Sequence, residues 1–244
     1  MQRLFRSFER MGLEYLLISG QASILYGAAT FSEDIDLWVR PTPANIQRLV
    51  AALCRVRATI HKLTPPLTTR NFRFGHGFHF LIPDRPTPVY LDVMGRPPRV
   101  DGFLSARRRS QQLNSPWGRL EVVSIEDLVE LKKTRRLSDY EVITNLVEIR
   151  LRDEAEPSTG LLTWAVKNSF RAETRFRYLR RLHQRARLAS CQKTVLGDLQ
   201  RLQTQDMAYW SRILRELRSI RSEGRLLPDG ASVAPIMSDP GKKP

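Results

Sequence analysis

Residues 13–39 constrain the fold of this chain most strongly, because they join a compact apolar run to an alternating one. The run LEYLLIS at 13–19 is typical of a buried strand. Gly20 interrupts it, and QASILYG at 21–27 has the composition of a short helix. The segment EDIDLWV at 33–39 then alternates polar and apolar residues, as a strand with one buried face does. Two strands joined by a short helix predict a sheet covered by helices.

Strand and helix patterns alternate along the rest of the chain. Further strands are predicted at 71–83, which alternates like one strand or a bulged hairpin, at 88–94 and at 120–124. Helices are predicted up to Gly12 and at 43–57, 100–110, 124–136, 137–151, 161–188 and 195–221. Ser124 is the predicted N-cap of its helix, with Asp127 three residues later. This order predicts an α/β (α+β) fold in which a mixed β-sheet body precedes a C-terminal helical annex.

Composition divides the chain into four segments. The body is predicted at 1–151, a linker (RDEAEPSTG) at 152–160, a basic helical annex at 161–224 and a disordered tail at 225–244. The net charge is +15, of which residues 1–160 carry +5 and residues 161–244 carry +10. This distribution favours a polyanionic partner, most often nucleic acid. A basic surface that serves only solubility is the alternative.

Composition also narrows the class of protein. Hydrophobic residues make up 41% of the chain and charged residues 27%, which excludes a wholly disordered chain. No apolar run approaches the roughly 20 residues of a membrane-spanning helix, and residues 1–12 lack the apolar segment of a signal peptide. The two cysteines, Cys54 and Cys191, predict neither a disulfide framework nor a metal site. We therefore expect a cytoplasmic protein without membrane contact.

Three aspartates on two predicted strands indicate a metal site. Asp34 and Asp36 point away from the apolar face of their strand, so that two carboxylates lie on one side of it. Their mutual repulsion is costly unless a cation neutralises them, and Mg²⁺ (or Mn²⁺) prefers such oxygen ligands. Asp92 has the same position on the strand at 88–94. Three such carboxylates can hold two Mg²⁺ ions for in-line phosphoryl transfer, whereas an ordinary carboxylate pair at a strand end is the alternative.

The turn before these aspartates adds a candidate phosphate site. A buried strand that runs into Gly20 and an immediate helix offers backbone N–H groups to a phosphate. A phosphate-binding turn and metal-binding carboxylates close together in the chain predict a site for a nucleoside triphosphate.

The stretch SGQASILYGAATFSEDIDL at 19–37 resembles the signature of the nucleotidyltransferase superfamily, which has the polymerase-beta-like fold. That signature is an apolar strand, a Gly-Gly or Gly-Ser turn, a spacer and Asp-hydrophobic-Asp, with a third Asp on a later strand. LDVM at 91–94 and VSIEDLVELKKTRRLSDYEVITNL at 123–146 extend the resemblance to bacterial nucleotidyltransferase-like proteins related to AbiEii-type abortive-infection toxins. The resemblance covers residues 12–150 and implies a nucleotidyltransferase core that moves an NMP from an NTP to a hydroxyl acceptor.

The resemblance implies roles for individual residues. It assigns metal binding and catalysis to Asp34, Asp36 and Asp92, with Asp92 as third ligand and base for the attacking hydroxyl, and nucleotide binding to Gly20, Gln21, Lys132 or Lys133, and Asp139, which orders that lysine. Two residues depart from the pattern. Gln21 replaces a small residue in the turn, and Thr30 stands where relatives often carry Arg. A catalytically degenerate protein that binds RNA or a partner protein is therefore the alternative to an enzyme.

The basic annex and the histidines give weaker signals. Residues 171–187 carry seven arginines, among which Arg177, Arg180 and Arg181 are the candidate nucleic-acid contacts. RNA or tRNA is thus the expected acceptor, and the resemblance implies a toxin with an antitoxin or other protein partner. His76 and His79 on one strand would face opposite sides, so a zinc pair is not expected.

Overall fold

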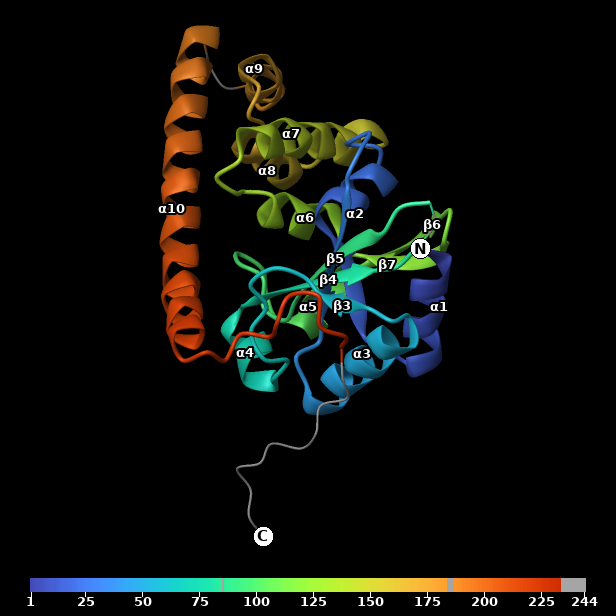
Figure 1. Ribbon diagram of the computed structural model, residues 1–244. Coiled ribbons are helices and arrows are strands. Elements are labelled where there is room, and N and C mark those ends of the chain that lie inside the picture. Colours follow the sequence, from blue (N-terminus) through green and yellow to red (C-terminus); the bar gives the residue numbers. More distant parts are fainter. Residues whose placement is uncertain (85, 184–186, 234–244) are drawn as a thin grey trace.

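The computed structural model describes residues 1–84, 86–183 and 187–233 and contains a seven-stranded sheet (Figure 1). The strands are β1 (Tyr15–Ile18), β2 (Asp34–Val39), β3 (Thr59–Ile60), β4 (Gly77–Ile82), β5 (Val89–Met94), β6 (Gln111–Ser115) and β7 (Gly118–Val122). Their order across the sheet is β3-β4-β5-β2-β1-β7-β6. The β2–β5 and β1–β7 pairs are parallel and the other pairs are antiparallel. The predicted mixed α/β architecture is confirmed.

Ten helices surround the sheet within the described residues. They are α1 (Gln2–Met11), α2 (Ser19–Leu25), α3 (Pro43–Arg55), α4 (Thr69–Phe74), α5 (Phe103–Arg109), α6 (Ile125–Leu131), α7 (Leu137–Arg152), α8 (Thr159–Asn168), α9 (Ala172–Arg181) and α10 (Leu188–Ser222). The long α10 runs along one side of the molecule, α7 to α9 gather at one end, and α1 and α3 lie at the opposite corner (Figure 1). Within the described ranges, none of the helices combines the length and the apolar composition of a membrane span.

The core forms on the apolar faces that the sequence predicted. Leu16 and Leu17 of β1 and Ile35 and Leu37 of β2 are fully buried. Apolar residues of the later helices, including Leu162, Tyr178, Val195 and Leu202, belong to the same buried cluster. The helices after residue 160 therefore pack into the core of the sheet domain rather than forming a separate one.

Two predicted helices are shorter than expected. Ser124 caps α6 as predicted, because its Oγ accepts from Asp127 N at 3.1 Å, but α6 ends at Leu131 and not near residue 136. The predicted helix at 161–188 divides into α8 and α9, with residues 169–171 between them. There Phe170 N donates to Thr144 Oγ1 at 2.9 Å, so a side chain of α7 takes a backbone donor that a continuous helix would have used.

The segment at 71–83 is not one strand. Residues 69–74 form α4, whose N-cap Thr68 accepts from Asn71 N, and β4 begins only at Gly77. Gly75 ends α4 with a φ of +104°, a left-handed conformation that favours glycine. The cap and the glycine stop decide the structure here, and they override the alternating pattern of the sequence.

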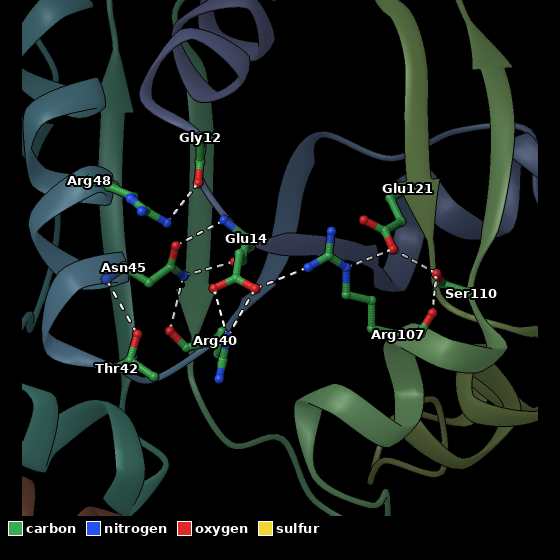
Figure 2. Close-up of polar contacts among 9 residues, drawn as sticks. All are labelled: Gly12, Glu14, Arg40, Thr42, Asn45, Arg48, Arg107, Ser110 and Glu121. Atoms are coloured by element: carbon green, nitrogen blue, oxygen red, sulfur yellow. Dashed lines mark hydrogen bonds and ion pairs between the residues drawn. The ribbon is translucent and has the colours of Figure 1, made fainter.

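A polar network fixes the end of the β1–β2 pair that lies away from the aspartates (Figure 2). The buried Asn45 of α3 accepts from Glu14 N at 2.8 Å, and its amide donates to the backbone oxygens of Glu14 and Arg40 at 2.9 and 3.0 Å. The Glu14 carboxylate accepts from Arg40 and from Arg107 of α5. These contacts set the β1–β2 register, which at the other end pairs Ile18 with Asp36.

The prediction that residues 225–244 are disordered is wrong for residues 225–233, which the structure describes. Leu227 N donates to Thr64 O at 2.9 Å, Ile60 N donates to Ala231 O at 2.8 Å, and Val233 N donates to Ala58 O at 3.0 Å. This segment pairs with the exposed edge of β3, which otherwise leaves backbone groups without partners. The rest of the predicted tail, at 234–244, lies outside the described residues.

Candidate active site

Three aspartates and a histidine meet on one face of the sheet. β2 and β5 are parallel neighbours, and their register places Asp36 directly beside Asp92. Asp34 lies on the same face of β2, two residues before Asp36. His79 of β4 is in register with Asp92 from the other side, and its Nδ1 lies 2.8 Å from Asp92 Oδ1. The structure thus brings together the three predicted carboxylates, although Asp92 is distant in sequence.

This arrangement perturbs the ionisation of two of the carboxylates. Burial, followed by the charges of Asp92 and Asp34, raises the pKa of Asp36 to about 7. A hydrogen bond from Ser19 and the charge of Lys132 act in the opposite direction. Burial and then the charge of Asp92 also raise the pKa of Asp34. Ionised Asp34 and Asp36 therefore carry a free-energy cost that a nearby cation would relieve.

Ser19 and Gly20 form the turn between β1 and α2. Ser19 has a φ of +59°, which residues other than glycine rarely adopt, so the strained residue is also the one that hydrogen-bonds Asp36. A Cβ atom at Gly20 would lie 2.1 Å from Ser32 Oγ, so close packing against Ser32 requires glycine there. The Gln21 amide donates to Ser32 O at 3.0 Å. Unlike Ser19 and Gly20, Gln21 does not line the cavity described below, which differs from its predicted position in a phosphate-binding turn.

The two predicted lysines point to different places. Lys132 is only 6% exposed, and its Nζ donates to Asp139 Oδ1 at 2.9 Å. Although burial of Asp139 acts the other way, Lys132 together with Thr134 lowers the pKa of that carboxyl. Lys133 instead pairs with Glu130 and lines a different surface pocket. Of the two lysines, only Lys132 lies with Asp139 in the cavity that contains the aspartates.

A cavity of about 850 Å³ joins these groups. Its lining includes Ser19, Gly20, Asp34, Asp36, His79, Asp92, Lys132 and Asp139 from the sheet and the α6–α7 region. Helix α10 supplies a further wall with Asp206, Trp210, Ile213, Leu214 and Leu217. The cavity therefore combines a charged side with an apolar wall that contains one indole, which is the usual composition of a site for an organic ligand with charged groups.

Specific contacts hold α10 against this cavity. Tyr209 Oη donates to Arg96 O at 3.1 Å, and Arg135 N donates to Asp206 Oδ2 at 3.1 Å. His76 is 1% exposed, and its Nε2 lies 3.5 Å from Glu216 Oε2 of α10. His76 precedes β4 rather than lying within it, so the alternation of a strand does not apply. Both His76 and His79 line the cavity, contrary to the expectation that they face opposite sides.

The donor chemistry of the carboxylate face suits a divalent cation. Carboxylate oxygens are the ligands that Mg²⁺ prefers, and burial together with the charges of Asp92 and Asp34 raises the pKa of Asp36. As the side chains stand, however, no three His, Cys, Asp or Glu residues in the described ranges are arranged to hold a metal ion. Asp92 is hydrogen-bonded to His79 through Oδ1, which leaves its second carboxylate oxygen for a metal ion.

The arginines of the annex are divided between paired and exposed positions. Arg171 and Arg177 pair with Glu148 of α7, and the buried Arg175 donates to Asp198 of α10 at 2.9 Å. Arg180 and Arg181 are exposed and form no ion pair with a described residue. Arg185, another member of the predicted set, lies outside the described residues. Much of this basic region therefore serves packing between helices.

Sequence reasoning missed three parts of the site. These are Ser19 at the end of a predicted strand, His79, whose alternation was tested only against a zinc pair, and one side of the helix predicted at 195–221. In that helix, α10, Ile213 is buried, and Ile213 and Trp210 also face the cavity. The spacing of His79 within an alternating segment was a usable signal, whereas nothing in the sequence places α10 beside the aspartates.

No family model and no curated protein matches this chain. Among solved structures, the chain is similar to the crystal structure of a putative nucleotidyltransferase from H. pylori. The sequence identity is 12%, the TM-score is 0.40, and the match covers 85% of this chain and 95% of that chain. Similarity at this level assigns neither a family nor an activity, so the function has to come from the chemistry of the cavity.

Proposed function

We propose that this cavity binds a nucleoside triphosphate with a divalent cation and transfers the NMP to a hydroxyl acceptor. One observation carries the proposal. Asp36 and Asp92 are direct neighbours on parallel strands, with Asp34 on the same face, and they share one cavity with the buried Lys132. This combination of a carboxylate cluster and a cation suits phosphoryl transfer, in which metal ions and basic groups stabilise phosphate charge.

Each group of cavity residues would have its own role in the transfer. Asp34, Asp36 and Asp92 would hold Mg²⁺ or Mn²⁺, which supplies the positive charge that orients the triphosphate and stabilises the transition state. Lys132 lies within electrostatic reach of Asp36 and would contact the triphosphate, while Asp139 positions the Lys132 ammonium through its 2.9 Å contact. The backbone at Ser19 and Gly20 lines the phosphate end of the cavity.

Asp92 is the group that would accept the proton of the attacking hydroxyl. A new bond then forms between the acceptor oxygen and the α-phosphorus, and pyrophosphate leaves with the electrons of the broken bond. One oxygen of Asp92 contacts His79 Nδ1 at 2.8 Å, and the other oxygen would take the proton. Trp210 on α10 offers an aromatic face to the base or to the acceptor.

RNA, including tRNA, is the acceptor that we propose, because the chain carries a net charge of +15 and exposed arginines such as Arg180 and Arg181. A toxin role, with an antitoxin or another protein as partner, extends this proposal and is supported only by the sequence resemblance. Such a role predicts growth arrest when the protein is expressed, relief of arrest by Asp36→Asn, and arrest by the matched control Asp153→Asn.

The experiment that tests the activity is incubation with each α-labelled NTP, Mg²⁺ and total RNA. Transfer of label to RNA that requires Mg²⁺ or Mn²⁺ is the expected result. Asp36→Asn should abolish it, whereas Asp153→Asn, which removes an exposed carboxylate at the end of α7, should not. Equal labelling by the wild type and Asp36→Asn would show that this carboxylate has no part in transfer.

One observation favours a second function, that of a degenerate protein that binds RNA or a partner without turnover. No three suitable side chains are arranged to hold a metal ion among the described residues, and one oxygen of Asp92 is hydrogen-bonded to His79. Calorimetric titration with Mg²⁺ and a non-hydrolysable NTP separates the two. Tight RNA binding with no metal-dependent NTP binding and no labelling would support the degenerate protein.

A further inference from the structure

A second cavity, of about 670 Å³, is lined by α1, the end of α3 and Asp84, and it shares no residue with the candidate active site. Four arginines line it: Arg3, Arg6 and Arg10 of α1 and Arg55 of α3. At 100° per residue, the three on α1 fall within an arc of about 60° on one side of the helix. Ser7 Oγ donates to Ala52 O at 3.1 Å and joins the two helices one turn before Arg55.

The charge of these arginines is not balanced by the residues around them. None of the four guanidinium groups forms a hydrogen bond or an ion pair with any residue in the described ranges. Asp84, the one carboxylate among the described lining residues, binds the ammonium of Met1. The first turn of α1 contains Arg3 and no acidic residue, although the helix dipole disfavours a cation there. Repulsion between Arg6 and Arg10, four residues apart, adds to this cost.

An anion in this cavity would remove both costs. The contrast with the annex is direct, because Arg171, Arg175 and Arg177 already pair with acids. The α1–α3 cavity, in contrast, gathers four arginines that no acid in the described ranges neutralises. We propose that the α1–α3 cavity binds phosphate groups of a nucleic-acid backbone.

The shape and lining of the cavity favour a backbone over a free nucleotide. Arg3 and Arg10 are separated by about 10 Å along the helix, more than one phosphate group spans. No aromatic side chain is among the described lining residues, so the cavity offers no platform for a base. Guanidinium groups bind phosphate through paired N–H donors. This site does not depend on the proposed nucleotidyl transfer, and a catalytically inactive chain would retain it.

The test is fluorescence anisotropy with labelled homopolymers of uridine and of thymidine, each of about 20 nucleotides, over a range of salt concentrations and in the presence of EDTA. The variant is Arg6→Gln/Arg10→Gln/Arg55→Gln. Its matched control is Arg119→Gln/Arg152→Gln/Arg218→Gln, which removes the same charge from scattered exposed positions. Thermal melts verify that both variants fold, and tripolyphosphate serves as a free-phosphate probe.

The cavity variant should weaken oligonucleotide binding about tenfold at low salt and should reduce the slope of log K against log salt by about two, since each single-strand phosphate contact contributes about 0.7. The scattered control should change affinity by less than about twofold. Loss on the RNA probe alone or on both probes supports the backbone site and identifies the nucleic acid. Equal losses in both variants would overturn the proposal, because net charge alone would then explain binding. A loss confined to tripolyphosphate would also overturn it.

Discussion

Asp36→Asn should make the protein more stable above neutral pH while abolishing the proposed nucleotidyl transfer. Burial and two neighbouring carboxylates raise the pKa of Asp36 from 3.8 to about 7. At 1.36 kcal/mol per unit, that shift corresponds to about 4 kcal/mol of destabilisation once the carboxyl ionises in the folded state. Because the carboxyl is partly solvated, we expect about 2–4 kcal/mol. Asparagine is nearly isosteric and carries no charge, so it should recover this free energy.

The pH dependence follows from the direction of the shift. An acid whose pKa is raised by folding binds its proton more tightly in the folded state, so ionisation disfavours folding. Wild type and variant should have similar free energies of unfolding below about pH 4, where the carboxyl is protonated in both states. The advantage of the variant should grow between about pH 4 and 7 and remain constant above pH 7.

The assay is urea unfolding followed by circular dichroism at several pH values in EDTA, with Asp153→Asn as the matched control. Added Mg²⁺ should stabilise the wild type by about 2.7 kcal/mol at a concentration 100 times its Kd and should stabilise the variant less. A difference between wild type and variant that does not change with pH would refute the raised pKa of Asp36. Equal stabilisation by Mg²⁺ would refute its role as a metal ligand.

Three further substitutions test other parts of the structure. Asn45→Ala removes the three hydrogen bonds of a buried amide and should lower the free energy of unfolding, measured with urea, by about 3 kcal/mol, whereas the exposed Asn114→Ala should change it little. Gly20→Ala places a Cβ atom against Ser32 and should cost about 1–3 kcal/mol, and Ser32→Gly in the same chain should restore stability; no rescue would argue against this clash. Arg177→Gln/Arg180→Gln/Arg181→Gln should lower the melting temperature through the lost Glu148 pair, and if the annex binds RNA it should also reduce the salt slope of RNA binding; an unchanged slope in a folded variant would exclude the annex as an RNA site.

The sequence by itself determined the elements in which local pattern and tertiary packing agree. The alternation of 33–39 identified a strand and placed Asp34 and Asp36 on its polar face, because the side-chain period of a strand is two. The same reasoning placed Asp92 on the polar face of β5. Local capping also predicted the start of α6 at Ser124.

The local sequence pattern predicted the wrong structure where two local signals competed or where a segment pairs with a strand distant in sequence. The alternating pattern at 71–83 predicts a strand, but residues 69–74 form a helix because Thr68 caps its start and Gly75 ends it. The edge strand β3 has two residues, too few for a periodic signal, and the chain at 227–233 is ordered only because it reaches that edge. The polar composition of this segment by itself predicts disorder.

Only the tertiary structure decided which predicted residues share a site. The parallel pairing of β2 with β5 put Asp36 beside Asp92, and the burial of Lys132 rather than Lys133 selected between adjacent lysines. Long-range packing also made α10 a wall of the cavity. A sequence records the period of each element, whereas register between strands and the docking of a distant helix depend on contacts that no local period encodes.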